Sequence, residues 1–154
     1  MIWIAVDAMG GDDAPRNIVD GALAAVRHFD LGVLLVGQGQ AIDAELARHL
    51  AVDGAIDRSR VRILDTPDVV GMEESPAAAL RRKPAASIRA AVDAVARGDA
   101  SALVSAGHTG ATVMAQALVT KSQPDGIVVS GIPARAHREQ LRRDAALSRI
   151  ERKP

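Results

Sequence analysis

Residue types suited to chemistry gather in one glycine-rich stretch of this sequence, "VSAGHTGA" (104–111). The side chains and glycines that matter in it are Ser105, Gly107, His108, Thr109 and Gly110. Two glycines permit a tight turn from a strand into a helix, and the exposed N–H groups and helix dipole of such a turn favour an anion. The two hydroxyl groups could add donors. The same spacing also fits a plain turn in which Thr109 caps the helix, so both interpretations stay open.

A second candidate stretch, "IAVDAMGGDDAP" (4–15), lies near the N-terminus. A short apolar run ends in Asp7, and the adjacent glycines Gly10 and Gly11 follow. The glycines would let a ligand or another loop approach the backbone, while Asp7 can orient donors or accept protons. Asp12 fits two roles equally well, a direct ligand contact or a cap for the next helix, for which Asp13 is also a candidate.

Neither cysteine nor histidine indicates a metal centre. The sequence has no cysteine, and its four histidines lack the spacing of metal ligands. We therefore predict no metal and no cofactor. His108 could also act as a general base, although the sequence suggests no partner to orient its ring.

Short apolar runs alternate with helical patterns along the chain. Runs typical of buried strands occur at 2–6, 32–36, 61–64 and 101–105. Apolar residues at helical spacing, or helix-start signals, occur at 14–28, 42–50, 75–83, 86–97 and 109–119. Strands with little alternation are buried on both faces, so this order predicts an α/β fold with a doubly wound, mostly parallel sheet. Ser75 is expected to cap a helix that has Pro76 in its first turn.

In such a sheet, ligands bind at the carboxyl ends of the strands. We therefore expect the Gly10–Gly11 loop and the Gly107–Gly110 turn to lie at the same edge and to face one cleft. The loops after the second and third predicted strands should lie along that edge too.

Composition narrows the class of protein. The 154 residues fit one domain, and 48% of them are hydrophobic although only Trp3 and Phe29 are aromatic. The formal net charge is zero, which provides no general attraction to nucleic acid. No apolar run approaches the ~20 residues that span a bilayer. No secretory signal is recognisable either, so we predict a cytoplasmic protein.

One alternative is a dinucleotide-binding domain. The stretch "VGQGQAI" (36–42) places Gly-x-Gly between a predicted strand and a helix, and Asp65 closes the next strand. Ile42 stands where the third glycine of that fingerprint belongs, which disfavours this alternative.

Three motifs in order resemble the PlsX family of phosphate acyltransferases. They are "DAMGGDDAP", "MEESPAAALRRKPAASI" (72–88) and "VSAGHTGA", and "LLVGQGQAIDAEL" and "RVRILDTPDVVGMEE" are similar to further family segments. The resemblance covers residues 1 to about 118. It implies a fold related to isocitrate dehydrogenase and phosphotransacetylase.

The resemblance also implies a reaction. Family members transfer an acyl group from acyl carrier protein to inorganic phosphate, and the acyl phosphate enters phospholipid synthesis. It implies a catalytic or phosphate-neutralising role for Lys83, beside Asp7 and His108, and phosphate or substrate contacts from the glycines and hydroxyl groups of both turns. His108 departs from the family pattern, since many relatives carry Asn there. Homodimers are implied for full-length members, with peripheral contact to the inner face of the membrane through the half that is missing here.

Residues 121–154 differ in character from residues 1–120, which we expect to form the N-terminal half of the family fold. The first 120 residues hold 11 Lys/Arg and 15 Asp/Glu, and the last 34 hold 8 and 4. This basic tail does not resemble the family segment that comes after the glycine turn, which predicts a sheet that is incomplete at its C-terminal end. A disordered or frameshifted tail is one explanation, and a truncated, non-catalytic fragment of the enzyme is the alternative function.

Overall fold

The computed structural model describes residues 1–53, 57–121, 129–130 and 135–136. Along the chain they form β1 (Ile2–Asp7), α1 (Arg16–His28), β2 (Leu31–Gly37), α2 (Gly39–Asp53), the short 3₁₀ helix η1 (Arg58–Arg60), β3 (Val61–Asp65), α3 (Pro76–Arg82), α4 (Ser87–Arg97), β4 (Ala102–Val104), α5 (Thr109–Lys121), β5 (Val129–Ser130) and β6 (Arg135–Ala136). The predicted alternation of strands and helices is confirmed.

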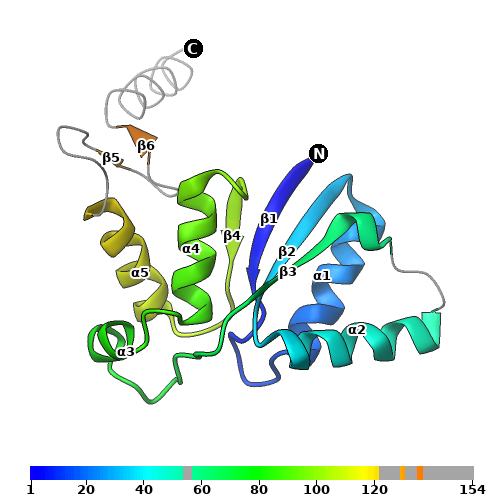
Figure 1. The fold of residues 1–154 in the computed structure, drawn as a ribbon, viewed down its shortest axis with the longest axis horizontal. Coiled ribbons are helices and arrows are strands. Elements are labelled where there is room, and N and C mark those ends of the chain that lie inside the picture. The colour runs from blue at the N-terminus through cyan, green and yellow to red at the C-terminus, as the bar shows by residue number, and fades with distance from the viewer. Residues whose placement is uncertain (54–56, 122–128, 131–134, 137–154) are drawn as a thin grey trace, which may run out of the picture.

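The main sheet has four parallel strands in the order β3-β2-β1-β4 (Figure 1). Ile4 of the central strand β1 pairs with Val33 of β2 on one side and with Ala102 of β4 on the other. The chain runs outward from β1 through β2 to β3 and then crosses back to place β4 on the far side of β1. The order of the strands therefore reverses between β1 and β4, and such a switch point is where doubly wound sheets bind ligands.

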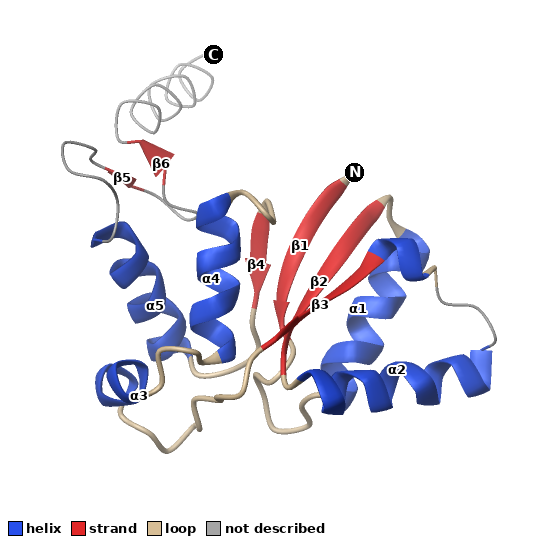
Figure 2. Cartoon of the chain, viewed as in Figure 1, coloured by secondary structure: helices blue, strands red, loops and turns tan. Residues whose placement is uncertain are grey.

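Helices cover the sheet on both faces, which is the predicted α/β architecture (Figure 2). On one face, α1 and α2 bury Leu23 and Ile42 against strand residues such as Leu35. On the other, Ala91 of α4 packs on Ala5. Helices α3 and α5 pack beside α4 through a cluster of Leu80, Ala86, Ile88, Val92, Ala111 and Ala115. The many alanines provide the small side chains that close helix packing requires.

The start of α1 differs from the sequence prediction. Pro15 precedes the first helical residue, and no side chain caps the helix, so the predicted caps Asp12 and Asp13 are wrong. Asp13 instead accepts a hydrogen bond from the Asn17 side chain at 3.1 Å, one turn further on. The helix α3 begins as predicted, with Ser75 at the cap position and Pro76 as its first residue, although the Ser75 side chain donates or accepts no capping bond.

β4 is one of the two edge strands of the sheet, and its Val104 is exposed. Within the described residues β4 pairs with β1 alone. The sequence offers "GIVVSG" (126–131) as a further strand, and Val129–Ser130 of it pairs antiparallel with Arg135–Ala136 rather than with β4. Apart from Lys121 and these two short strands, the predicted basic tail lies outside the described residues.

An ion pair between α1 and α2 gives a first testable prediction. Asp20 of α1 contacts His49 of α2 and lies 3.0 Å from the Arg48 guanidinium. Burial tends to raise the pKa of Asp20, but the hydrogen bond and positive charge of His49, together with Arg48, outweigh it and lower that pKa below 3.8. A lowered carboxylate pKa contributes stability that is complete above the unfolded value and is lost as pH falls through the folded one.

We therefore expect Asp20→Asn to unfold at a lower urea concentration than wild type near neutral pH. The difference between the two midpoints should shrink as pH falls below 3.8 and through the lower pKa of the folded state, where Asp20 loses its charge. Urea titrations across that range measure it. A difference that stays constant with pH would show that the ion pair does not contribute.

Candidate functional site at the switch point

Two backbone segments meet at the switch point between β1 and β4. A Cβ atom added to Gly10 would lie 2.7 Å from the backbone nitrogen of Gly107, and one added to Gly107 would lie 2.9 Å from the Cα of Gly10. Only glycine fits at both positions, because backbone atoms cannot rotate away as a side chain can. The expectation that the two glycine turns share one edge and one cleft is confirmed.

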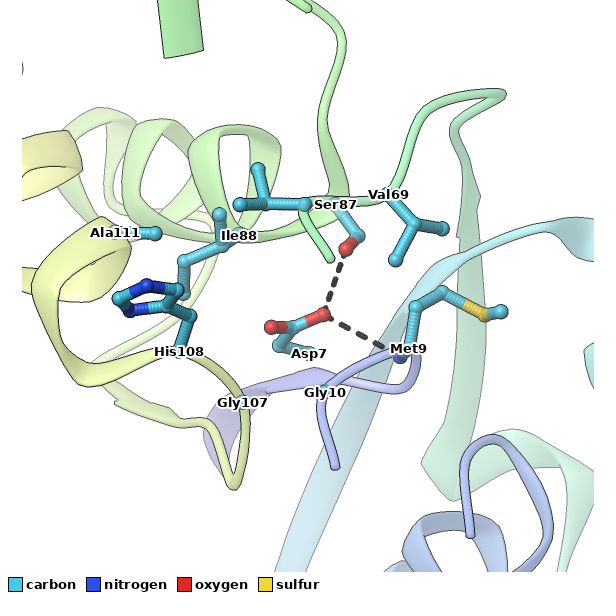
Figure 3. Close-up of a pocket in the computed structure, with 10 residues that line it drawn as sticks. Asp7, Met9, Gly10, Val69, Ser87, Ile88, Gly107, His108 and Ala111 are labelled. Carbon is cyan, nitrogen blue, oxygen red and sulfur yellow. Dashed lines mark hydrogen bonds between the residues drawn. The ribbon is translucent and has the colours of Figure 1, made fainter. Parts of the chain in front are cut away.

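Asp7, at the end of β1, connects three segments of the site. Its side chain is 3% exposed and accepts hydrogen bonds from the hydroxyls of Ser87 at 2.7 Å and Ser105 at 2.9 Å. The backbone N–H of Met9 donates to the same carboxylate at 3.3 Å. Figure 3 shows the carboxylate between Ser87 of α4 and the Met9 loop. The three hydrogen bonds offset the free-energy cost of burying the Asp7 carboxylate. Through these bonds Asp7 acts as an anchor for both turns.

The turn between β4 and α5 is organised by its own side chains. Ser105, which donates to Asp7, accepts a hydrogen bond from the Gly107 N–H at 3.2 Å. The Nδ1 atom of His108 accepts one from the Gly110 N–H at 3.1 Å, so His108 caps α5. A neutral imidazole that accepts at Nδ1 carries its proton on Nε2. His108 is therefore arranged as a donor at Nε2, which does not fit a general base at that atom.

The first N–H groups of α5 remain available. Within the part of the chain that the structure describes, the backbone N–H groups of His108 and Thr109 have no acceptor. They stand at the positive end of a helix of 13 residues. A helix N-terminus with free amides favours an anion.

His108, one of these two residues, borders a small pocket. It is lined by Asp7, Met9, Gly10, Val69, Val70, Ser87, Ile88, Gly107, His108 and Ala111. Its interior volume is about 10 Å³, which is room for roughly one water molecule. Any larger ligand therefore requires its walls to move apart.

Some predicted site residues lie beside the pocket rather than in its wall. Gly11 has a φ of 108°, a left-handed conformation that favours glycine, and it approaches the carbonyl of Ala106. Thr109 begins α5. Asp12 is exposed and does not line the pocket. Gly110 lies against the His108 ring and Pro76.

Lys83 also lies outside the pocket wall. It follows the last residue of α3, and its Nζ donates to the Val69 carbonyl at 2.8 Å and pairs with Glu74. Since Val69 lines the pocket, Lys83 contacts a residue of the wall without lining the pocket itself.

Sequence reasoning missed two contributors to the site, Ser87 and the Val69–Val70 segment. Ser87 is 2% exposed and is the first residue of α4, a position where a serine usually indicates only a helix start. Its place at the end of "MEESPAAALRRKPAASI" was the one available signal. Nothing in the apolar pair at 69–70 distinguishes it from an ordinary core segment.

The dinucleotide alternative fails at the start of α2. The carboxylate of Asp65 accepts a hydrogen bond from the Gly39 N–H at 2.7 Å, so the chain places its own anion where a pyrophosphate would bind. Ile42 is fully buried in the core, and its side chain prevents the close packing of helix on strand that a third glycine would allow. Around these segments, as elsewhere in the described residues, no group of three metal-ligating side chains occurs.

A parallel sheet covered by helices on both faces, with a pocket at its switch point, places this chain in the doubly wound α/β class. The sequence profile of the fatty acid synthesis protein family matches residues 2–134. The chain belongs to this family, the PlsX family.

Three relatives illustrate the similarity, and each is named phosphate acyltransferase. One from Pseudomonas savastanoi pv. phaseolicola is 44% identical over 143 residues, covering 90% of this chain and 41% of the relative. One from Desulfitobacterium hafniense (strain Y51) is 49% identical over 118 residues, covering 77% and 33%. One from Pelotomaculum thermopropionicum is 49% identical over 124 residues, covering 80% and 34%. The chain thus spans about two fifths or less of the relatives that it matches.

Proposed function

We propose that this chain takes part in the transfer of an acyl group from acyl carrier protein to inorganic phosphate, which yields an acyl phosphate for phospholipid synthesis. The observation that carries the proposal is the meeting of the two glycine turns beside the free N–H groups of His108 and Thr109, in a chain whose relatives are named phosphate acyltransferase. Phosphate is the substrate that this pocket would hold.

The reaction needs little covalent chemistry from the protein. A phosphate oxygen attacks the thioester carbonyl, a tetrahedral oxyanion forms, and the C–S bond breaks. The thiolate of the carrier protein leaves and takes up the proton that phosphate releases. Because phosphate is itself the nucleophile, catalysis consists of holding the anion, aligning it with the thioester and stabilising the oxyanion.

Named residues fit these tasks. The N–H groups of His108 and Thr109 would bind phosphate oxygens at the positive end of α5, and the Nε2–H of His108 is a further donor. The buried carboxylate of Asp7 repels a multiply charged anion, so phosphate belongs on the α5 side of the pocket. The role of Asp7 is then to position Ser105, which in turn holds the N–H group of Gly107 in the turn before α5.

The partners and the location follow from the same proposal. Acyl carrier protein would deliver the acyl chain, and the chain would work in the cytoplasm, with homodimers and peripheral membrane contact as further expectations from the family. None of the helices that the structure describes is long and apolar enough to cross a membrane.

The direct test mixes this chain with acylated carrier protein and radiolabelled phosphate and measures labelled acyl phosphate. We expect this chain to form acyl phosphate faster than a Gly107→Val variant does. The rate should be far lower than that of a full-length relative, because the chain spans about two fifths of that protein's length. Equal rates for the chain and the variant would contradict the proposal.

A second candidate is a non-catalytic form that binds phosphate without turning it over. The small volume of the pocket and the short span of the chain favour it. Calorimetric phosphate binding combined with no labelled acyl phosphate would identify this form.

A further inference from the structure

The segment that joins β3 to α3 supplies one wall of the Asp7 pocket, through Val69 and Val70. It belongs to no helix or strand, so its position depends on individual contacts. The Ser87 N–H donates to the Asp68 carbonyl at 2.9 Å, which ties the segment to the start of α4. The next residue, Val69, is held by Lys83.

Lys83 and Glu74 hold the segment by its backbone. The Lys83 ammonium donates to the Val69 carbonyl at 2.8 Å and pairs with the Glu74 carboxylate. Glu74 in turn accepts from the Gly71 N–H at 2.9 Å, and the Gly71 carbonyl accepts from the Glu74 N–H at 3.1 Å. One ion pair thus fixes two backbone positions on either side of Val70.

The ion pair is partly shielded from water. The side chains of Lys83 and Glu74 are 31% and 29% exposed. The hydrogen bond from Lys83, supported by that from Gly71, lowers the pKa of Glu74. The Glu74 carboxylate is therefore charged near neutral pH. Lys83 uses two of its three N–H donors for the Val69 carbonyl and the Glu74 carboxylate.

We propose that Lys83 and Glu74 form a latch that positions the Val69–Val70 wall of the phosphate pocket, and that Lys83 is a positioning residue rather than a phosphate ligand. This inference rests on the proposed function, because the pocket is assigned to phosphate there. It changes the role that family resemblance gives to Lys83. The lysine acts on the pocket through the Val69 carbonyl.

The two roles for Lys83 predict opposite effects of removing Glu74. If Lys83 bound phosphate, Glu74→Ala would free its charge, remove a nearby negative charge and strengthen phosphate binding. If the pair is a latch, Glu74→Ala and Lys83→Met both leave the Val69–Val70 wall without a fixed position. The walls then part more easily, but the wall no longer holds the bound anion against the amides of α5, and binding weakens. Lys83→Arg keeps a charged donor and should restore part of the affinity.

Phosphate titration by calorimetry and hydrogen exchange without phosphate provide the test on the whole chain. We expect Lys83→Met and Glu74→Ala each to weaken phosphate binding and to speed exchange of the Gly71 and Glu74 amides by about tenfold, which corresponds to losing roughly one net hydrogen bond. The double variant should be no worse than either single one. Arg81→Met is the control, since the Arg81 guanidinium contacts the Ala77 carbonyl of its own helix.

The two measurements separate this inference from the proposed function. Tighter phosphate binding by Glu74→Ala, or unchanged exchange in both variants, would overturn the latch. Wild-type chain that binds no phosphate would contradict the proposed function, whereas faster exchange in both variants would still support the latch.

Discussion

Replacing Gly107 with valine will abolish most phosphate binding while the chain still folds. The new Cβ would lie 2.9 Å from the Cα of Gly10, so the two turns must separate and the amides at the start of α5 lose their places. We expect a loss of affinity of at least about tenfold and an overpacking cost of about 1–3 kcal/mol. Calorimetry with inorganic phosphate measures the first, and urea unfolding measures the second.

The matched control is Gly21→Ala in α1. A Cβ at Gly21 would meet nothing within 4 Å. This substitution should leave phosphate binding unchanged and stabilise the chain by roughly 0.5–1 kcal/mol, since alanine favours a helix interior over glycine. A folded Gly107→Val variant with wild-type phosphate affinity would refute the anion site at this turn.

Replacing Asp7 with alanine should cost more stability than any other single change at the site. The substitution leaves the buried hydroxyl of Ser87 without its acceptor and releases Ser105 at the same time. Hydrogen bonds to a charged group contribute about 1.5–3 kcal/mol each, so we expect a loss of about 3 kcal/mol in the free energy of unfolding. Asparagine should rescue part of the loss, because its amide oxygen can accept from Ser87 and its NH₂ can donate to the Ser105 hydroxyl oxygen, although it lacks the charge.

Asp12→Ala serves as the comparison for Asp7→Ala. Asp12 carries the same charge five residues along the chain but is exposed, and a change there should stay within about 0.5 kcal/mol. Urea unfolding of both variants at neutral pH decides the matter. Similar losses would mean that Asp7 does not hold the two turns together.

The fold could be predicted from the sequence because local patterns carry it. Short apolar runs such as "GVLLV" are too brief for helices and too continuous for half-exposed strands, and the helices between them carry apolar residues at regular spacing. The start of α1 could not be predicted from the sequence. Asp12 and Asp13 are both suitable capping residues by type, but Pro15 occupies the cap position and no side chain caps the helix.

Only part of the site could be predicted from the sequence, because some of its contacts follow from the topology and others follow no sequence pattern. Asp7, Gly10 and Gly107 belong to types whose function depends on backbone position, and the parallel topology brings their loops to one edge. Lys83 could be recognised as a cation, yet its partner Glu74 lies nine residues away, at the other end of α3. No periodicity specifies such a contact, so the sequence indicated a charge and the structure determined what it touches.

The strand order has a consequence for when the pocket can exist during folding. The bonds from Ser87 and Ser105 to Asp7 close loops of 80 and 98 residues, whereas β1, β2 and β3 pair with their neighbours in the sequence. Closing such loops costs conformational entropy before the new contacts can offset that cost. A chain emerging from the ribosome can therefore assemble three strands while the carboxylate of Asp7 still faces water. That carboxylate becomes buried only when α4 and β4 dock against β1, the first strand to be made, so the pocket is a marker of completed folding.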